Sequence, residues 1–332
     1  MEPSRVHATL LVAGAVLAFV CAVGPAAAAS QRTFVSTAGV DNPACSVASP
    51  CRTFMGAVAA TTKRGEVIVL DSGGYGQIII TQSISIIAPP GVYAGVSVSS
   101  GDGITITTAN NDSVTLRGLT INNVASCNRG IHYDGDGYLQ LDDVRVIGCS
   151  AECLRFAPSA NGHLKVEGST FAYCGWGIVI APVALGRVFI ERSVTHHNES
   201  TGIYVADNAK VVVRASSSVF NDNGVWAFSQ VPGNATELII ESSDLSNNGT
   251  GLLVGLLAGP ASASVNNSTI AANATGVATS DNGTVLLGAT TISRNNIGVA
   301  CNGTGVAKSQ GNNLISGNSI TDGCVPTVVG SK

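Results

Sequence analysis

The chain has 332 residues, of which only 11% are charged, and its formal net charge is −4. Glycine is abundant at 39 residues, whereas aromatic residues make up 5% of the chain. No basic stripe of the kind that binds nucleic acid is present, so we expect no nucleic-acid partner. The frequent glycines suit a chain that turns every few residues.

The first 29 residues have the features of a secretory signal peptide. Arg5 lies near the start, an apolar stretch covers residues 10–23, and Ala27-Ala28-Ala29 precedes Ser30. A basic start, a short apolar stretch and small residues before a cleavage point are typical of such signals. We therefore expect a secreted or periplasmic protein with no membrane span after signal removal. An uncleaved membrane anchor is the alternative.

Residues 30–75 differ in composition from the rest of the chain. A short helical pattern over residues 55–60 is followed by the apolar run 67–70 and a Gly73-Gly74-Tyr75 turn. The end of a stacked β-structure exposes apolar core and unpaired strand groups. We expect this N-terminal segment, and its alanine-rich helix above all, to cap the repeats that follow.

Residues 76–325 repeat one pattern: an apolar residue, two variable residues, Asn, two variable residues, Gly and an apolar residue. A second element with the same spacing is a pair of alternating apolar residues, such as Leu139/Leu141 and Leu164/Val166. A period near two dozen residues indicates one unit stacked on copies of itself. The glycines of six successive copies, 22 to 27 residues apart, are Gly177, Gly202, Gly224, Gly251, Gly276 and Gly298.

The repeat predicts an all-β fold, a right-handed parallel β-helix of about ten coils. Val, Ile and Thr alternate over short stretches, which suits strands, and helix signals are missing inside the repeats. Parallel crossovers are right-handed almost without exception. The Asn of each copy can tolerate a left-handed turn conformation, and its amide can hydrogen-bond up and down the stack. A leucine-rich repeat needs Leu at fixed positions and a helical half, which this chain lacks. Residues 326–332 are expected to form a C-terminal tail.

Eight cysteines follow the signal, and an even number in an exported chain favours disulfides. Cys45 and Cys51 bracket a short loop and are expected to pair. Cys301 and Cys324 are the only late cysteines and are expected to pin the last coil. For the central four we predict Cys127–Cys153 with Cys149–Cys174, because Cys149 and Cys174 occupy the Asn position of successive coils. The alternative is Cys127–Cys149 with Cys153–Cys174.

These motifs resemble the pectin-lyase-like superfamily of right-handed β-helix proteins, over roughly residues 33–325. The resemblance rests on the segment from Phe34-Val35-Ser36 to Thr53-Phe54, on Gly65-x-x-Ile68 and Gly74-Tyr75, and on the repeated Asn-x-x-Gly-apolar motif. The superfamily includes polysaccharide lyases and hydrolases, epimerases and adhesins, so the resemblance implies a fold and leaves the activity open.

The signatures of the superfamily's enzymes are largely missing. Of the three motifs of galacturonan hydrolases only Asp142-Asp143 matches, and there is no Gly-His-Gly. No calcium cluster with a basic residue, as in pectate lyases, can be recognised. These departures weaken an enzymatic interpretation.

Two groups of polar residues are candidates for catalysis. Asp142, Glu167 and Glu191 follow the paired apolar residues of successive coils, where they would share a cation, raise their pKa values or extend into water. We interpret them as solvated turn residues. His196 and His197 adjoin Tyr173 one coil before and Asn221-Asp222 one coil after, a grouping that suits acid–base chemistry or a metal.

A third group follows the Gly-apolar step and is expected to face outward. Its basic residues lie at one end and its aromatic residues further along, which suits sugar stacking or a protein contact. Either Val225 or Trp226 faces inward, since that coil is short. The members of the group are His132, Arg155, Val179, Tyr204, Trp226 and Leu253.

The turn with Asp134 and Asp136, next to His132, offers carboxylates to calcium, and no other cofactor is expected.

The leading hypothesis is a non-catalytic exported protein that binds polysaccharide or a cell-surface partner through His132, Arg155, Tyr204 and Trp226. A lyase or hydrolase acting on acidic glycans is the first alternative. A structural envelope or adhesin-like protein is the second.

Overall fold

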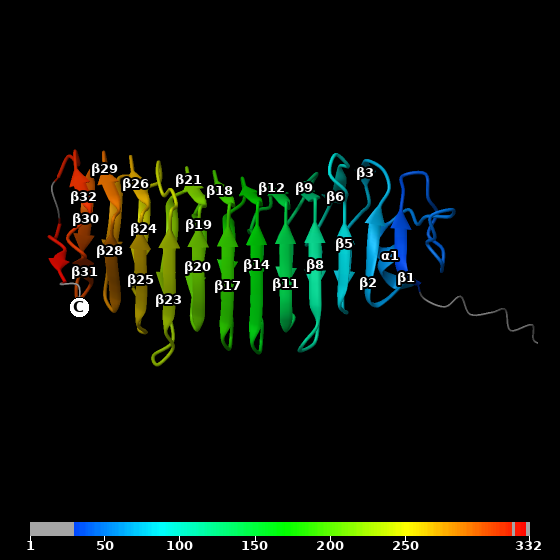
Figure 1. The fold of residues 1–332 in the computed structure, drawn as a ribbon, viewed down its shortest axis with the longest axis horizontal. Coiled ribbons are helices and arrows are strands. Elements are labelled where there is room, and N and C mark those ends of the chain that lie inside the picture. Colours follow the sequence, from blue (N-terminus) through cyan, green and yellow to red (C-terminus); the bar gives the residue numbers. More distant parts are fainter. Residues whose placement is uncertain (1–29, 321–322, 330–332) are drawn as a thin grey trace, which may run out of the picture.

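The computed structural model describes residues 30–320 and 323–329, and the expected signal peptide lies outside these residues. The chain forms one elongated parallel β-helix whose strands run across the long axis (Figure 1). This confirms the predicted all-β solenoid of about ten coils. No helix in the described part of the chain is long and apolar enough to cross a membrane.

Each coil contributes strands to three faces, and every strand pairs in parallel with its equivalents in the neighbouring coils. The first face, here called the long sheet, has thirteen strands. They are β1 (Ser30–Val35), β2 (Thr61–Val69), β5 (Ile84–Ile87), β8 (Ser113–Arg117), β11 (Gly137–Asp142), β14 (Gly162–Glu167), β17 (Gly186–Glu191), β20 (Ala209–Arg214), β23 (Thr236–Glu241), β25 (Ala261–Asn266), β28 (Gly283–Gly288), β31 (Val306–Ser309) and β33 (Thr327–Val328).

The second face is a sheet of ten strands. They are β4 (Ile78–Ile80), β7 (Ile104–Ile106), β10 (Ile131–Tyr133), β13 (Glu152–Phe156), β16 (Trp176–Ile180), β19 (Thr201–Ala206), β22 (Asn223–Phe228), β24 (Thr250–Val254), β27 (Thr275–Thr279) and β30 (Ile297–Cys301).

The third face is narrow and is divided into a seven-stranded and a three-stranded sheet. The seven strands are β3 (Gly73–Gly74), β6 (Ala94–Val98), β9 (Leu119–Asn123), β12 (Arg145–Ile147), β15 (Thr170–Ala172), β18 (Val194–His196) and β21 (Ser217–Val219). The three strands are β26 (Thr269–Ala271), β29 (Thr291–Ser293) and β32 (Leu314–Ser316). Isolated bridges from Asp244 to Ser217 and to Thr269 connect the two parts.

The alternating apolar residues build the interior of the stack. In β11, Leu139 and Leu141 are buried, whereas Tyr138, the residue before Leu139, is exposed. The same alternation repeats in register on the next strand, where Leu164 and Val166 lie beside Leu139 and Leu141. Since side chains of a strand alternate between faces, each coil sends one set of residues into the core and the other outward.

An asparagine ladder runs along the turn between the third face and the ten-stranded sheet, as the repeat predicted. The side-chain amide of Asn198 donates to Asn221 Oδ1 at 3.0 Å, and that of Asn221 donates to Asn248 Oδ1 at 3.3 Å. Further along, Asn273 donates to Asn295 at 3.0 Å. These side chains are buried, so the ladder satisfies polar groups that water cannot reach.

The ladder asparagines do not use the left-handed conformation that their residue type tolerates. Positive φ falls on the residue before each ladder position: 53° at His197, 57° at Phe220 and 57° at Ala272. The ladder amide has to point along the stack to reach both neighbouring coils. The sharp corner of the turn is therefore made by the preceding, exposed residue.

A second ladder, of serines, occupies the turn between the long sheet and the third face and was not predicted. The backbone N–H of Ser169 donates to Ser193 Oγ at 3.2 Å, and that of Ser193 donates to Ser216 Oγ at 3.1 Å. Here too a left-handed residue precedes the buried polar one, with φ 48° at Arg192 and 47° at Ala215. Both turns thus use the same arrangement.

The disulfides confirm two pairings and correct two. Cys45–Cys51 and Cys301–Cys324 are formed as predicted. The central four pair as Cys127–Cys149 and Cys153–Cys174, which is the alternative arrangement, and the predicted Cys127–Cys153 and Cys149–Cys174 bridges are wrong. The longer turn at residues 124–127 brings Cys127 beside the next coil, where the N–H of Ser150 donates to Cys127 O. Because Cys149 is bonded to Cys127, Cys174 forms its disulfide with Cys153.

Both ends of the stack carry specific structure. Helix α1 (Phe54–Ala60) lies at the N-terminal end of the solenoid (Figure 1), where Thr53 Oγ1 accepts from Gly56 N and the Phe54 and Ala57 side chains are buried. The helix agrees with the expected N-terminal cap. Strands β1 to β3 of the segment 30–75 already belong to the sheets, and β33, in the segment 326–332, pairs with β31.

Candidate functional site

The outer face of the ten-stranded sheet carries the row of residues singled out in the sequence. Their inward neighbours, such as Ile131, Ile203 and Val225, are buried in the core. Trp226 therefore faces outward, and the uncertainty between Val225 and Trp226 is resolved. In register on consecutive strands, the row is His132, Arg155, Val179, Tyr204, Trp226 and Leu253.

The aromatic part of this row is a connected cluster. Tyr204 meets Trp176 edge to face with ring centroids 4.9 Å apart, and it meets Trp226 in the same way at 5.4 Å. Phe228, at the end of β22, packs under Tyr204 at 4.8 Å and is itself buried. Trp176, Tyr204 and Trp226 are half-buried, so each leaves part of its ring open to solvent.

The cluster is held in place by its surroundings. Trp226 Nε1 donates to the backbone oxygen of Gly255 at 3.5 Å, in the loop after β24. Burial among the neighbouring rings raises the pKa of Tyr204, so its hydroxyl stays protonated at neutral pH. Rings fixed in this way lose little conformational freedom when a ligand binds.

Beside the aromatic cluster lies a charged network centred on His132. His132 Nδ1 is 2.9 Å from Asp102 Oδ2, and its Nε2 is 2.9 Å from Asp134 Oδ2. Because ionised carboxylates only accept hydrogen bonds, both contacts are satisfied when both ring nitrogens donate. The imidazole is largely enclosed, with 16% of its side chain exposed.

The network continues toward the aromatic cluster through two arginines. Arg129 contacts both Asp102, at 3.4 Å, and Glu152, at 2.9 Å. Glu152 in turn accepts from Arg155 at 3.1 Å. Arg155 is one third exposed, so part of its guanidinium faces solvent on the aromatic side of the network.

Sequence reasoning missed Asp102, Arg129 and Glu152, as well as Trp176 and Phe228. Asp102 and Arg129 precede the strands of their coils and therefore fall outside the alternating pattern. Trp176 directly precedes the glycine of its repeat, whereas the row from His132 to Leu253 is formed by residues that follow the Gly-apolar step. Asp102, Arg129 and Trp176 each directly precede the glycine of a Gly-apolar step, and this shared position is a signal that could have found them.

The turn proposed for calcium has its carboxylates engaged elsewhere. Asp134 contacts His132, whereas Asp136 accepts from Ala160 N at 2.7 Å and from the Ser159 hydroxyl. In the described residues no group of three or more His, Cys, Asp or Glu is placed to hold a metal ion. The arrangement at this turn therefore gives no support to a calcium site.

The carboxylates at the ends of three strands of the long sheet, Asp142, Glu167 and Glu191, form the expected column, and each is paired with a cation. Glu167 contacts Lys165 at 2.6 Å and also pairs with Arg192, which reaches Glu191 at 3.1 Å. Asp142 pairs with Arg117 at 2.7 Å. The hydrogen bond from Lys165 lowers the pKa of Glu167, so the carboxylate remains ionised and does not resemble a general acid.

His196 and His197 lie together at the turn but without a carboxylate. Their Nδ1 atoms are 2.9 Å apart, and the His197 ring stacks between Tyr173, at 5.2 Å, and Phe220, at 4.9 Å. Burial, aided by His197 and Arg145, lowers the pKa of His196. Neither histidine has an ion-pair partner in the described residues. Their contacts are those of an aromatic stack on the turn.

Fold and surface together define a β-solenoid whose ten-stranded sheet carries aromatic and charged side chains on its outer face. A family model described as "Right handed beta helix region" matches residues 67–217 and 102–257, which together are more than half of the chain. The protein belongs to this right-handed β-helix family, which confirms the fold that the repeat predicted. No curated protein matches the sequence.

Solved structures with the same fold include carbohydrate-active enzymes. The A-modules of mannuronan C-5 epimerases AlgE6 and AlgE4 from Azotobacter vinelandii match with TM-scores of 0.57 and 0.56 and identities of 18% and 15%. The match covers 71% of this chain and 71% and 72% of theirs. Pectate lyase Pel9A matches at a TM-score of 0.49 and 16% identity, over 89% of this chain and 81% of its own. At such identities the likeness shows the fold alone.

Proposed function

We propose that this protein is exported and binds a polysaccharide along the outer face of its ten-stranded sheet. The observation that carries the proposal is the row running from His132 and Arg155 to Tyr204 and Trp226, which places charge and aromatic rings on one flat, rigid surface. A sheet whose strands lie about 4.8 Å apart presents these groups at regular steps to an extended chain.

The aromatic and the charged part of the face suit two different groups of a polysaccharide, the sugar ring and the carboxylate. Half-buried Trp226 and Trp176 offer apolar surface to the C–H face of a sugar ring, and Tyr204 supports both of them. The solvent-facing part of Arg155 offers paired N–H donors to a carboxylate. An acidic polysaccharide would use both parts at once.

Export is supported by the cysteines. The structure pairs all eight cysteines of residues 30–329 in four disulfides, and such bonds persist in oxidising compartments. Together with the signal-like first 29 residues, this favours a secreted or periplasmic location.

Fluorescence titration of the purified mature protein tests the binding face. The probes are mannuronan, which the name of the two epimerases suggests, polygalacturonate, and a neutral glucan. Trp226→Ala is expected to weaken binding about tenfold, since a well-placed aromatic contact contributes roughly 1.4 kcal/mol or more. Arg155→Gln should weaken binding of the two acidic probes only. The control is Phe220→Ala, an exposed ring on the turn. Binding that survives both Trp226→Ala and Tyr204→Ala would refute the proposed face.

A second candidate function is chemistry on the same polysaccharide, and the enclosed His132 between two carboxylates favours it. The side chain of Asp134 at Nε2 is 47% exposed, so a substrate that takes its place would lie within hydrogen-bond reach of the imidazole. His132 would then be suited to proton transfer, with Arg129 near the substrate carboxylate. Release of unsaturated uronates or of reducing ends from acidic glycans would show it. Such turnover should be lost in His132→Gln and retained in His197→Ala and Glu191→Ala. If none of the probes is turned over, the catalytic function is refuted and the proposed binding function is unaffected.

A further inference from the structure

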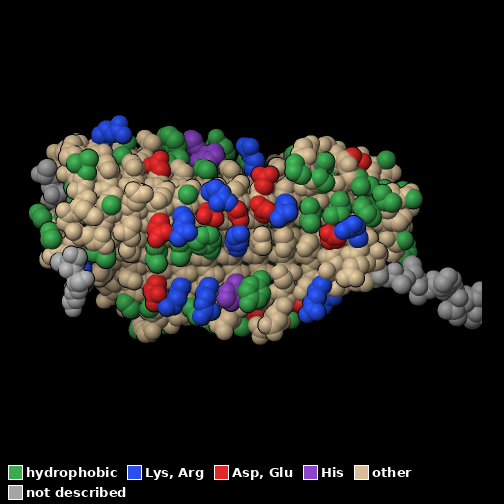
Figure 2. Space-filling view, in the orientation of Figure 1, with side chains coloured by type: hydrophobic (Ala, Val, Ile, Leu, Met, Phe, Trp, Pro, Cys, Tyr) green, Lys and Arg blue, Asp and Glu red, His purple; other side chains and the backbone are tan. Residues whose placement is uncertain are grey.

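Two neighbouring histidines lie at the corner between the third face and the ten-stranded sheet, outside the row proposed to bind polysaccharide. His196 ends β18, and His197 is the left-handed residue of the turn, with φ 53°. The next residue, Asn198, is buried in the asparagine ladder, whereas His197 is exposed. The ladder therefore fixes the backbone from which both imidazoles extend. Figure 2 shows histidine side chains at the surface along the upper edge of the molecule, where β18 lies in Figure 1.

The ring of His197 is held from both sides. Tyr173 and Phe220 are the corner residues of the coils before and after it, and they share its left-handed conformation, with φ 58° and 57°. The His197 ring stacks on Tyr173 with centroids 5.2 Å apart and on Phe220 with centroids 4.9 Å apart. The interplanar angles are 22° and 21°, so the three rings are nearly parallel. A ring fixed in this way loses little conformational freedom when it binds a ligand.

The ring of His196 is directed to His197 by its apolar neighbours. Ala172 and Val219 lie beside His196 in register on β15 and β21, and neither offers a polar side chain. The Nδ1 atoms of His196 and His197 are 2.9 Å apart, and the ring planes enclose an angle of 87°. In a neutral pair, the Nδ1–H of one ring donates to the Nδ1 of the other. The turn thus presents two imidazole nitrogens side by side at the surface.

The distance between the two Nδ1 atoms is close to the one that adjacent positions of a square-planar metal ion require. With metal–nitrogen bonds of about 2.0 Å, an angle of 90° at the metal places the two nitrogens about 2.8 Å apart. A tetrahedral ion such as Zn²⁺ needs about 3.3 Å. The observed 2.9 Å therefore favours the square-planar arrangement. The His196 ring can turn about its Cβ–Cγ bond, a soft torsion, to direct its lone pair at the metal without moving the backbone.

From this geometry we propose that His196 and His197 bind one Cu²⁺ ion through their Nδ1 atoms, in adjacent positions of a square plane. Among divalent first-row ions, Cu²⁺ combines this geometry with the highest affinity for nitrogen ligands. The described residues place no group of three or more His, Cys, Asp or Glu together, so water completes the coordination at this exposed turn. The proton shared by the two Nδ1 atoms moves to Nε2 of its own ring, which leaves both imidazoles neutral.

The charges around the pair give the proposal a second, independent test. Burial, and further the charges of His197 and Arg145, lower the pKa of His196. Arg145 on β12 is therefore near enough to act on the site electrostatically, and its charge repels a bound cation. Removing this charge leaves both ligands in place, so copper should then bind more tightly.

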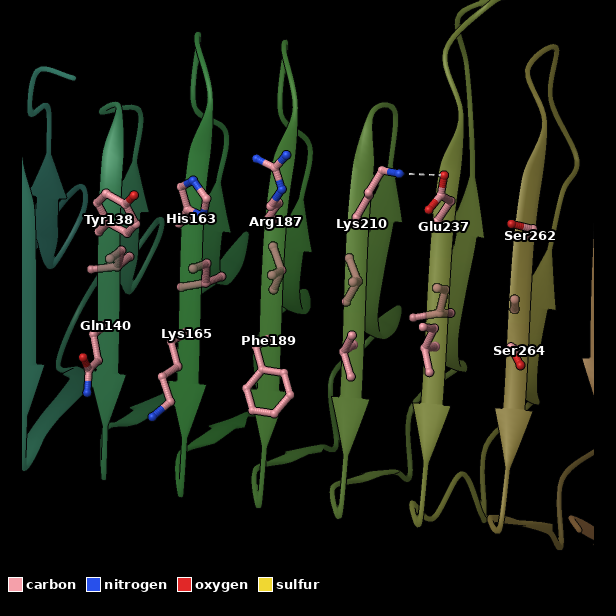
Figure 3. Close-up of a pocket in the computed structure, with 18 of the residues that line it drawn as sticks. Tyr138, Gln140, His163, Lys165, Arg187, Phe189, Lys210, Glu237, Ser262 and Ser264 are labelled. Carbon is pink, nitrogen blue, oxygen red and sulfur yellow. Dashed lines mark hydrogen bonds and ion pairs between the residues drawn. The ribbon is translucent and has the colours of Figure 1, made fainter. Parts of the chain in front are cut away.

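Electron paramagnetic resonance of the mature protein with added Cu²⁺ tests the site, and titration against a copper chelator gives the affinity. We expect the axial spectrum of a square-planar ion with splitting from imidazole nitrogen. His196→Gln and His197→Asn should each weaken binding about tenfold or more, since even the loss of a partner behind a metal ligand typically costs roughly 10–100-fold. Asparagine tolerates the positive φ at position 197. His163→Gln is the matched control, because His163 lies beside Tyr138 and Arg187 on the outer side of the long sheet (Figure 3), without a second histidine.

The outcomes separate a built site from unspecific binding. Copper binding that is weakened in His196→Gln and His197→Asn, unchanged in His163→Gln and tightened in Arg145→Gln supports the proposal. Full affinity in the two ligand variants would place the copper elsewhere, for example at the N-terminal amine, and overturn it. An equal loss in His163→Gln would do the same. Zn²⁺ binding as tight as that of Cu²⁺ would overturn the choice of ion. Thermal melts without metal show that the variants compared are folded.

Discussion

Tyr204 and Trp226 are cross-strand neighbours on β19 and β22, and their rings meet edge to face at an interplanar angle of 89°. Trp176 meets the other side of Tyr204 at 80°. The tyrosine therefore stands between two indoles, and the three rings form one supported surface. Because the three rings are in contact, the effects of substituting them are expected to be non-additive.

The fluorescence of Trp226 should report ligand binding directly. In a Trp176→Phe background, we expect emission that acrylamide quenches readily, because Trp226 faces outward and is only half-buried. Adding mannuronan or polygalacturonate should reduce the quenching. The complementary Trp226→Phe protein, which keeps Trp176, serves as the control. A blue-shifted and protected signal without ligand would contradict an open aromatic surface.

Breaking the asparagine ladder should destabilise the solenoid. Asn221 Oδ1 accepts from both the N–H and the side-chain amide of Asn198, each at 3.0 Å and buried. Asn221→Ala leaves these donors without a partner, and we expect a loss of about 2–4 kcal/mol in the free energy of unfolding, measured by chemical denaturation. Asn161→Ala, at an exposed turn, should change stability by no more than about 0.5 kcal/mol. Similar effects of the two substitutions would show that the ladder contributes little.

The left-handed corner residues predict opposite effects for two neighbouring alanines. Ala272 is exposed with φ 57°, whereas Ala274, also exposed and in the same turn, has a negative φ. Ala272→Gly should raise the free energy of unfolding by about 0.5–1 kcal/mol because glycine adopts this conformation without strain. Ala274→Gly should lower it by a similar amount. Thermal and chemical melts of both variants check the signs, and a loss of stability in Ala272→Gly would be inconsistent with the corner.

The central cysteines can be checked by peptide mapping without reduction. We expect peptides linked through Cys127–Cys149 and Cys153–Cys174. Removing the second bridge in a Cys153→Ser/Cys174→Ser protein opens a loop of 21 residues, which should cost about 3 kcal/mol of stability. Peptides joined as Cys149–Cys174 would instead favour the pairing expected from the asparagine positions.

His163 should make the stability of the solenoid depend on pH. Burial, and secondarily the charge of Arg187, lowers the pKa of His163, so folding loses stability as the pH falls below the usual range of histidine. His163→Gln removes this titrating group, so the variant should lose less stability than the parent protein between about pH 7 and about pH 5. Chemical denaturation at both pH values measures the difference. Equal losses in the two proteins would count against a lowered pKa of His163.

The sequence-based predictions were most accurate where one residue's environment repeats in every coil. Leu139 and Leu164, or Tyr204 and Trp226, could be placed in register because the Gly-apolar step recurs at a nearly constant interval. The predictions were least accurate at single turns. The extra residues at 124–127 changed the partner of Cys149, and no periodic signal shows how far such a loop reaches.

By itself the sequence determined the parallel stack, its approximate number of coils and the outward row from His132 to Tyr204. A period-two apolar pattern repeated every two dozen residues can bury all its apolar side chains only when the copies lie on top of one another. Only the tertiary structure decided how separate coils meet in contacts that no local pattern encodes. Asp102 and His132 are 30 residues apart, and their 2.9 Å contact depends on the height of one turn above the next strand. Arg187 and Phe189 likewise line a hollow along the outer side of the long sheet, because they point outward from the same strand as the core residue Val188 between them.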